Sequence, residues 1–111
     1  DRCLSRGLGD VYKRQFKTID VIMTPTTRGP AFKIGSKGDD PIQMYLEDLF
    51  TISANLAGLP AMSLPNGNIE NKPIGLQIIG NFLDESTILN FAHMFQNETN
   101  WHMYTPEGIK Q

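Results

Sequence analysis

The stretch DDPIQMYLEDLFTISANLAGLPA (residues 39–61) constrains the fold of this chain most, because it carries both a helix start and a helix stop. Asp40 suits an N-cap, the proline after it suits the first helical position, and Gln43 stands where a capping box places Glu or Gln. Gly58, with a proline two residues later, is a typical stop. Seven residues share one face of this predicted helix: Ile42, Tyr45, Leu46, Leu49, Ile52, Ser53 and Leu56. The stretch therefore predicts one capped amphipathic helix.

A short β-branched run, residues 19–23, precedes this helix and predicts a strand. Its nearly continuous apolar character is typical of a strand covered on both faces. We expect the strand to end at Pro25, because proline cannot donate to a ladder. Residues 26–38 are rich in Gly, Pro, Lys and Ser and predict a long loop.

Two further strands and a second helix are predicted after residue 60. Residues 61–65 and 73–80 favour an antiparallel hairpin joined by a polar loop over residues 66–72. The second helix opens at Asp84, where Leu83 and Ile88 are placed as a hydrophobic staple. Its predicted apolar stripe consists of Ile88, Phe91, Ala92 and Phe95, and Trp101 is the aromatic anchor of the polar tail.

The order strand, helix, β-hairpin, helix places the chain in the α/β class. One-sided helices and apolar strands should pack as layers. Three strands make a poor sheet alone, and the first would leave an open edge that a larger sheet must cover. We therefore expect the chain to be a slice of a larger domain.

Composition excludes several function classes. A formal charge of −2 gives no electrostatic footprint for nucleic acid, and no apolar run approaches the length of a membrane span. A single cysteine, Cys3, allows neither an internal disulfide nor a multi-cysteine metal site. His93 and His102 lack the spacing of helical zinc ligands, so no metal site is expected. A cytoplasmic protein without a membrane partner is the default expectation.

The first fifteen residues differ from the rest. Four basic and two acidic residues occur in this segment, against six basic and ten acidic residues from Phe16 onward. The run DVYKRQ (residues 10–15) resembles a translated linker found at the ends of environmental reading frames. We interpret residues 1–15 as a non-native segment, with a frayed native helix end as the alternative, and residues 16–111 as part of one domain.

No nucleophile or phosphate loop can be assigned from pattern alone. Five residues separate the two glycines of the segment GPAFKIGSK (residues 29–37), where a P-loop has four, and lysine does not follow the second glycine directly, which excludes a P-loop. The serines lack a GxSxG elbow or a suitably placed base, and Ser63 is predicted to be a satisfied sheet residue. The catalytic set is therefore expected outside this chain.

Asp48 is the one candidate binding residue. On a helical wheel it lies at the margin of the apolar stripe, beside Tyr45 and Ile52, whereas Glu47 points farther toward solvent. A partly shielded carboxylate there could pair with an ammonium or guanidinium group. Pattern alone favours an ordinary boundary acid over a binding role.

The ordered motifs of the chain resemble the amidase-signature family over residues 16–101. They are DVIMTPTT (20–27), AFKIG (31–35), DDPIQMYLEDLFT (39–51), NLAGLPAMSLPNG (55–67) and KPIGLQIIG (72–80). Their combination is most similar to the A subunits of glutamine-dependent tRNA amidotransferases. The resemblance implies that the chain is the C-terminal slice of an αβα sandwich with a mixed central sheet.

The same resemblance implies an activity and an assembly. Such proteins hydrolyse glutamine with a Lys–Ser–Ser triad, which would lie before residue 1, so this piece alone is expected to be inactive. The ammonia converts Glu-tRNA(Gln) or Asp-tRNA(Asn) to the amide form, as in a carbon–nitrogen ligase that uses glutamine as amido donor. The B and C subunits would complete the heterotrimer, with ATP and magnesium used on the B component. The acid of the YLxDxxT motif, here Asp48, resembles the ligand of the glutamine α-ammonium.

Two alternatives stay open. The first is a piece of another amidase-signature hydrolase that acts on a small amide without tRNA. The second is a complete, non-catalytic α/β binding module. The choice between Gln-tRNA and Asn-tRNA products is not encoded in these residues.

Overall fold

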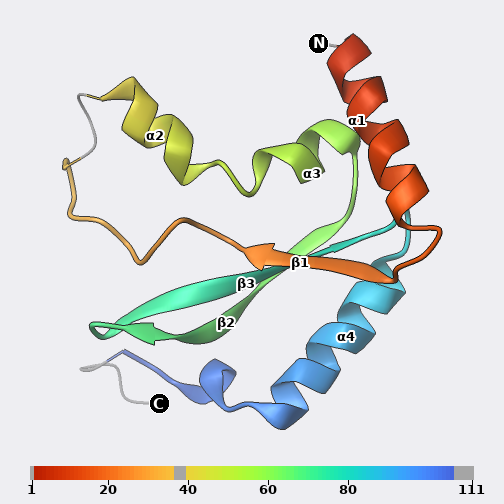
Figure 1. The fold of residues 1–111 in the computed structure, drawn as a ribbon. Helices are drawn as coiled ribbons and strands as arrows, with labels where there is room; N and C mark the ends of the chain where they lie inside the picture. Colours follow the sequence, from red (N-terminus) through yellow and green to blue (C-terminus); the bar gives the residue numbers. More distant parts are fainter. Residues whose placement is uncertain (1, 37–39, 107–111) are drawn as a thin grey trace.

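A small antiparallel sheet with helices on both faces forms the body of the chain (Figure 1). The computed structural model describes residues 2–36 and 40–106, with side chains from residue 7 onward. The elements are α1 (Arg2–Gln15), β1 (Val21–Pro25), α2 (Pro41–Glu47), α3 (Ile52–Ala57), β2 (Ala61–Ile69), β3 (Lys72–Gly80), α4 (Glu85–Glu98) and the 3₁₀ turn η1 (Trp101–Met103). The predicted α/β class and the order of strand, helix, hairpin and helix are confirmed.

The three strands lie in the order β1-β3-β2, and both neighbouring pairs are antiparallel. The predicted hairpin is therefore confirmed, and β1 stands at an edge of the sheet as expected. Thr24 of β1 and Ser63 of β2 flank Gln77 of β3 in one row across the sheet. The Gln77 amide donates to the Phe50 carbonyl in the turn between α2 and α3, so this row lies on the face of the sheet that is turned toward these helices.

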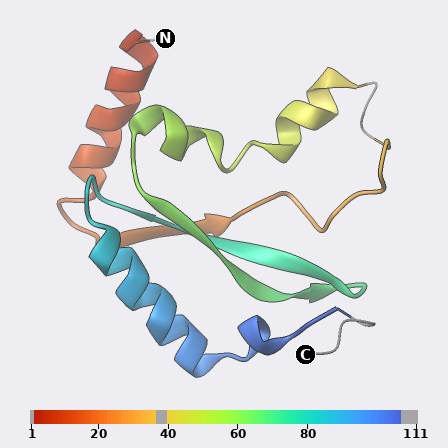
Figure 2. The same cartoon turned by 180° about the vertical axis from the view of Figure 1, so that it is seen from behind.

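The opposite face of the sheet forms the hydrophobic core with α4 (Figure 2). Leu64 and Ile78 pack there against Ile88 and Ala92 of α4, which confirms the predicted stripe of this helix. Burying an isoleucine side chain contributes about 1.5–3 kcal/mol. A Cβ at Gly80 would lie 2.7 Å from the side chain of Ile88, so glycine allows α4 to approach the sheet closely.

Strand β1 is less covered than its apolar sequence predicts. The strand begins at Val21 and ends at Pro25, as the proline argument predicts, but Met23 is 54% exposed. The helix α4 packs on β2 and β3 and leaves Met23, at the edge of the sheet, uncovered. The prediction of cover on both faces is wrong for this part of the strand.

The predicted single helix is two helices with a turn between them. Asp40 caps α2, since its Oδ1 accepts from the backbone N–H groups of Ile42 (3.0 Å) and Gln43 (3.4 Å). Gly58 ends α3 in the left-handed conformation, so both predicted ends are confirmed. Between the helices, the Thr51 hydroxyl donates to the Asp48 carbonyl oxygen at 3.2 Å. Such side-chain bonds compete with the helical ladder, and the seven-residue face does not continue through the turn.

The hairpin turn is tighter than predicted. Strands β2 and β3 extend to Ile69 and Lys72, so the turn consists of Glu70 and Asn71 alone. Both residues have positive φ, 52° and 63°, as in the two-residue type I′ turn. A bulge beside Pro65 shifts the register, and the pairing continues through residues 67–69, so the predicted loop over residues 66–72 is wrong.

The segment around α4 differs from its prediction in one contact. Asp84 precedes the helix as expected, but Leu83 has a φ of 60° and is 72% exposed. Leu83 therefore does not cover Ile88, and the predicted hydrophobic staple is absent from this helix start. Trp101 lies near Gly67 and stacks on Tyr104, with ring centroids 5.5 Å apart.

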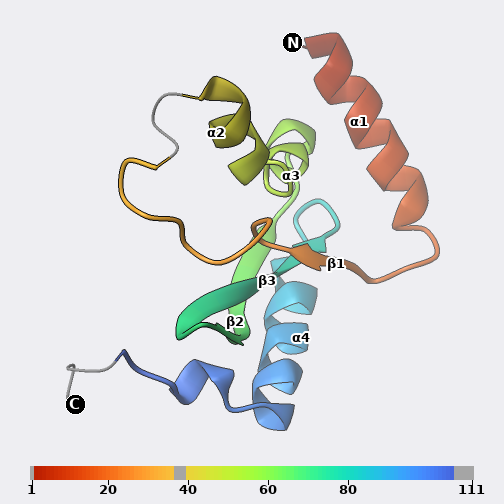
Figure 3. The same ribbon diagram turned by 60° about the vertical axis from the view of Figure 1, so that its left-hand side comes forward.

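Residues 2–15 form α1, which packs beside α3 (Figure 3). The Tyr12 hydroxyl donates to Ser53 Oγ at 3.0 Å. A helix in this place fits either origin of the segment, and the non-native origin of residues 1–15 stays a prediction. The sequence of the parent gene upstream of Phe16 tests it.

Candidate functional site

Asp48 stands at the C-terminal end of α2, on the turn that separates the two helices. Its backbone N–H donates to the Tyr45 carbonyl (3.1 Å), and its own carbonyl accepts from the N–H groups of Thr51 and Ile52, both at 3.2 Å. These bonds close residues 48–51 into a compact turn. The position of the Asp48 side chain therefore depends on where this turn lies above the sheet.

The side chain of Asp48 lines a cleft between α2 and the loop that follows β1. We call it the acidic cleft; its lining residues are Thr27, Gly29, Pro30, Ala31, Phe32, Met44, Glu47, Asp48 and Pro73, and its volume is about 420 Å³. Asp48 is exposed and Glu47 is half-buried. The predicted order of shielding is wrong, because the helix breaks at Asp48 and the helical wheel does not apply beyond Glu47.

The acidic cleft suits a cationic group. Two carboxylates stand in or next to the last turn of α2, which contains no basic residue. The C-terminal end of a helix carries partial negative charge, so a cation bound there is stabilised by the two carboxylates and by the helix end. An ammonium group can supply the positive charge and donate up to three hydrogen bonds. The arrangement can bind such a group, and the hydroxyl in its lining, that of Thr27, donates to the Gly29 carbonyl oxygen at 2.7 Å.

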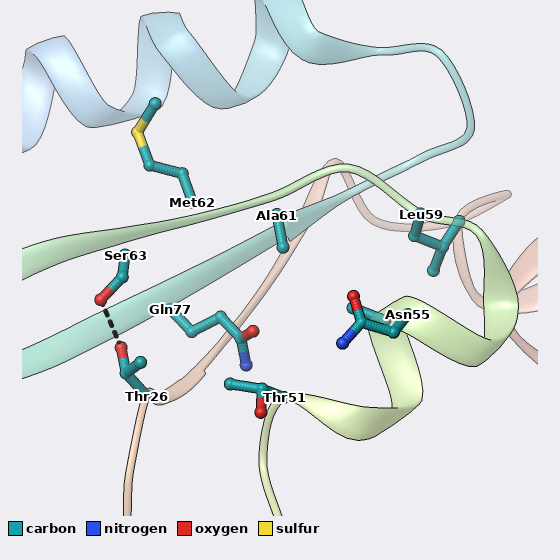
Figure 4. A pocket seen from close by; sticks show the side chains of 9 residues that line it. Thr26, Thr51, Asn55, Leu59, Ala61, Met62, Ser63 and Gln77 are labelled. Atoms are coloured by element: carbon teal, nitrogen blue, oxygen red, sulfur yellow. Dashed lines mark hydrogen bonds between the residues drawn. The ribbon is translucent and has the colours of Figure 1, made fainter. Parts of the chain in front are cut away.

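A second, polar pocket lies on the same face of the sheet (Figure 4). Its lining residues are Thr26, Thr51, Ala54, Asn55, Leu59, Ala61, Met62, Ser63 and Gln77. Thr26 Oγ1 and Ser63 Oγ are 2.7 Å apart and share a hydrogen bond. The prediction that Ser63 is a satisfied sheet residue is confirmed, since its hydroxyl faces another hydroxyl and not a base.

The remaining polar candidates stand away from these two pockets. His93 and His102 are exposed, as expected. The hydroxyls of Ser36 and Ser86 bond to the Lys33 carbonyl and to Asp84 Oδ1. Within the described ranges, no group of three or more His, Cys, Asp or Glu residues is arranged to hold a metal ion. In the same part of the chain, no helix is both long and apolar enough to cross a membrane.

Gln77 is a site residue that the sequence pattern did not single out. It is 4% exposed, and its amide lies between β1 and the turn after α2. One feature of the sequence could have identified it. The run IGLQIIG (residues 74–80) is otherwise apolar, and a glutamine within a covered strand must find hydrogen-bond partners.

A protein-family model and several curated proteins match most of this chain. The family model described as Amidase matches residues 4–89. The chain is 48% identical to the A subunit of the glutamyl-tRNA(Gln) amidotransferase of Saccharophagus degradans, over 96% of this chain and 25% of that protein. It is 55% identical to the protein of the same name from Cellvibrio japonicus, over 86% of this chain and 20% of that protein.

Solved structures give the same grouping. The A subunit of the Thermotoga maritima glutamyl-tRNA(Gln) amidotransferase superposes with a TM-score of 0.85 at 38% identity, over 89% of this chain and 22% of that one. A 6-aminohexanoate cyclic dimer hydrolase superposes with a TM-score of 0.79 at 26% identity, over 90% of this chain and 23% of that one. The chain thus spans about a quarter or less of the length of these relatives.

Proposed function

The chain belongs to the amidase family, and from this premise we propose that it forms part of the glutamine-hydrolysing subunit of a tRNA-dependent amidotransferase. The observation that carries the proposal is the identity of about half to relatives that share one name across several bacterial species. That name describes an enzyme that acts on Glu-tRNA(Gln). The hydrolase of a cyclic amide has the same fold but only 26% identity.

Within such a protein we assign this chain a binding role. Asp48 is the ligand of the α-ammonium group of glutamine, and the acidic cleft is where that group enters. The serine nucleophile and its activating lysine come from the part of the protein that this chain does not span. Hydrolysis supplies ammonia for converting Glu-tRNA(Gln), or Asp-tRNA(Asn), to the amide.

The assembly is part of the same proposal. By resemblance to enzymes of this kind, the B and C subunits complete a cytoplasmic heterotrimer. The B component binds the misacylated tRNA and uses ATP and magnesium to activate its carboxylate. The net charge of −2 on this chain agrees with a division of labour in which another surface binds the RNA.

The test uses the full-length protein in complex with its partners. Replacing Asp48 by Asn removes the charge but keeps the shape of the side chain. Because a hydrogen bond to a charged group contributes about 1.5–3 kcal/mol, we expect the KM for glutamine to rise about 10-fold to 100-fold. Amidation with added ammonium chloride should stay within about twofold, because free ammonia bypasses glutamine binding.

Glu47→Gln is the matched control, since it removes one carboxylate from the same cleft. We expect it to change the glutamine KM much less than Asp48→Asn. Equal effects of the two variants would mean that the cleft acts through its total charge and would refute the specific role of Asp48. Hydrolysis of a small amide by the complex at full rate, with no tRNA-dependent amidation, would instead favour the simple amidase.

A further inference from the structure

Gln77 is buried in the middle strand of the sheet, where an amide needs partners for both of its N–H groups. Its Nε2 lies 2.8 Å from Thr24 Oγ1 and 2.7 Å from the Phe50 carbonyl oxygen. A carbonyl oxygen can only accept, so the NH₂ end of the side chain must face Phe50. The Thr24 hydroxyl donates to the Pro25 carbonyl at 2.9 Å and can therefore accept from Gln77. Both donors of the amide are used.

The Phe50 carbonyl is available to Gln77 because Phe50 lies in the turn between the two helices. This turn is closed on itself through the Asp48 carbonyl, which accepts three hydrogen bonds from Thr51 and Ile52. The hydrogen bond from the Gln77 amide to the Phe50 carbonyl therefore fixes the position of this turn, and of Asp48 within it, relative to β3. Figure 4 shows the side chain pointing from β3 toward Thr51 and Asn55.

The same amide also bonds to the strand that leads into the other wall of the acidic cleft. Thr24 lies opposite Gln77 in the ladder, and the chain continues from it through Pro25 to Thr27 and residues 29–32, which line the cleft together with Asp48. One side chain thus connects the α2–α3 turn on one side and the end of β1 on the other. A change at Gln77 should alter the width of the cleft.

We infer that Gln77 is a positioning residue for Asp48. Through its hydrogen bond to the Phe50 carbonyl, Gln77 fixes the turn that carries Asp48 and thereby influences the affinity for glutamine. The inference rests on the proposed role of Asp48. Loss of the amide would leave the turn free to shift, and a carboxylate displaced by about 1 Å loses much of its binding contribution.

The test is a double-mutant cycle in the full-length protein with its partners. Gln77→Met keeps the volume and removes both donors. We expect it to raise the glutamine KM about 10-fold, with the ammonia-dependent rate within about twofold. In the Asp48→Asn background the same substitution should add less than about twofold, because two residues that act through one contact are not additive.

A second pair of variants keeps the inference testable if Gln77→Met does not fold. Thr24→Val removes one acceptor of the amide, and Thr24→Ser retains it. We expect a rise in the glutamine KM for the valine variant, smaller than for Gln77→Met, and near-normal KM for the serine variant. Equal behaviour of the two Thr24 variants would contradict the inference.

The outcomes separate the two proposals. If Asp48→Asn leaves the glutamine KM unchanged, the proposed function of Asp48 fails. Suppose instead that Asp48→Asn raises the glutamine KM. If Gln77→Met then has no effect on this KM, or if the KM increase of the double variant equals the product of the two single increases, Asp48 keeps its role and the positioning role of Gln77 is overturned. Loss of the ammonia-dependent rate in Gln77→Met at normal thermal stability would also overturn it.

Discussion

Gly75 lies beneath the Thr26–Ser63 hydrogen bond, and the absence of a side chain there allows the two hydroxyls to meet over β3. A Cβ at this position would lie 2.7 Å from Thr26 Oγ1 and 2.8 Å from Ser63 Oγ. Both distances are shorter than real Cβ contacts, so the hydroxyl pair would have to separate. The polar pocket therefore depends on a glycine as much as on its polar residues.

We expect Gly75→Ala to lower the stability of the full-length protein by about 1–3 kcal/mol, as overpacking in a close-packed region does. Gly29→Ala is the matched control, because a Cβ at Gly29 meets nothing within 4 Å. Denaturant unfolding of both variants measures the difference. A Gly75→Ala variant as stable as Gly29→Ala would show that the Thr26 and Ser63 side chains move apart without cost.

At the scale of elements, the β2–β3 hairpin carries a local strain. Glu70 adopts a φ of 52° in the type I′ turn, where a residue with a side chain other than Asn or Asp is disfavoured. Asn71, at 63°, is a favoured residue in the same conformation. The sheet thus imposes a conformation that suits one of the two turn residues better than the other.

Substituting the turn should change stability in opposite directions. Glu70→Asn is expected to stabilise the protein by about 0.5–1 kcal/mol, because Asn tolerates positive φ. Asn71→Val is expected to destabilise it by about 1–2 kcal/mol, because a β-branched residue resists this region. Thermal unfolding of the full-length protein measures both changes. Stabilisation by the valine variant would mean that the turn has another geometry.

At the scale of the whole molecule, both helices of the α2–α3 segment and the turn between them carry exposed apolar side chains. Ile42 is 68% exposed and Tyr45 58%, and Leu49, Ile52 and Leu56 are exposed with them. These are the residues that the helical pattern predicts to face a neighbour. The strands β1 and β2 also stand at the two edges of the sheet. Exposed apolar patches and open strand edges favour association.

We expect the 111-residue chain, expressed alone, to associate or to remain partly folded, with strong binding of a hydrophobic dye. Its denaturation midpoint should depend on protein concentration. The full-length protein should unfold with a midpoint that does not. A single cooperative transition of the isolated chain, independent of concentration, would favour the alternative of a self-contained binding module.

Local chemistry made a large part of this fold predictable. The Asp40 cap, the Gly58 stop, the stripe of α4 and the antiparallel hairpin all follow from residues a few positions apart. The motifs also indicated the amidase family, which the comparisons confirm. The role of Asp48 as an ammonium ligand came from resemblance alone and stays a prediction.

Sequence by itself thus determined where elements begin and end when a cap, a glycine or a proline marks the boundary. Tertiary structure decided the exposure of the Asp48 carboxylate, and at the helix break it adds a long-range bond to the local one between Thr51 and Asp48. Residues 41–57 have a continuous amphipathic pattern, but Gln77 bonds the Phe50 carbonyl across 27 positions of sequence. A helical wheel includes only neighbours along the chain, and a hydrogen bond from a distant strand outweighs the small local preference for continuing a helix.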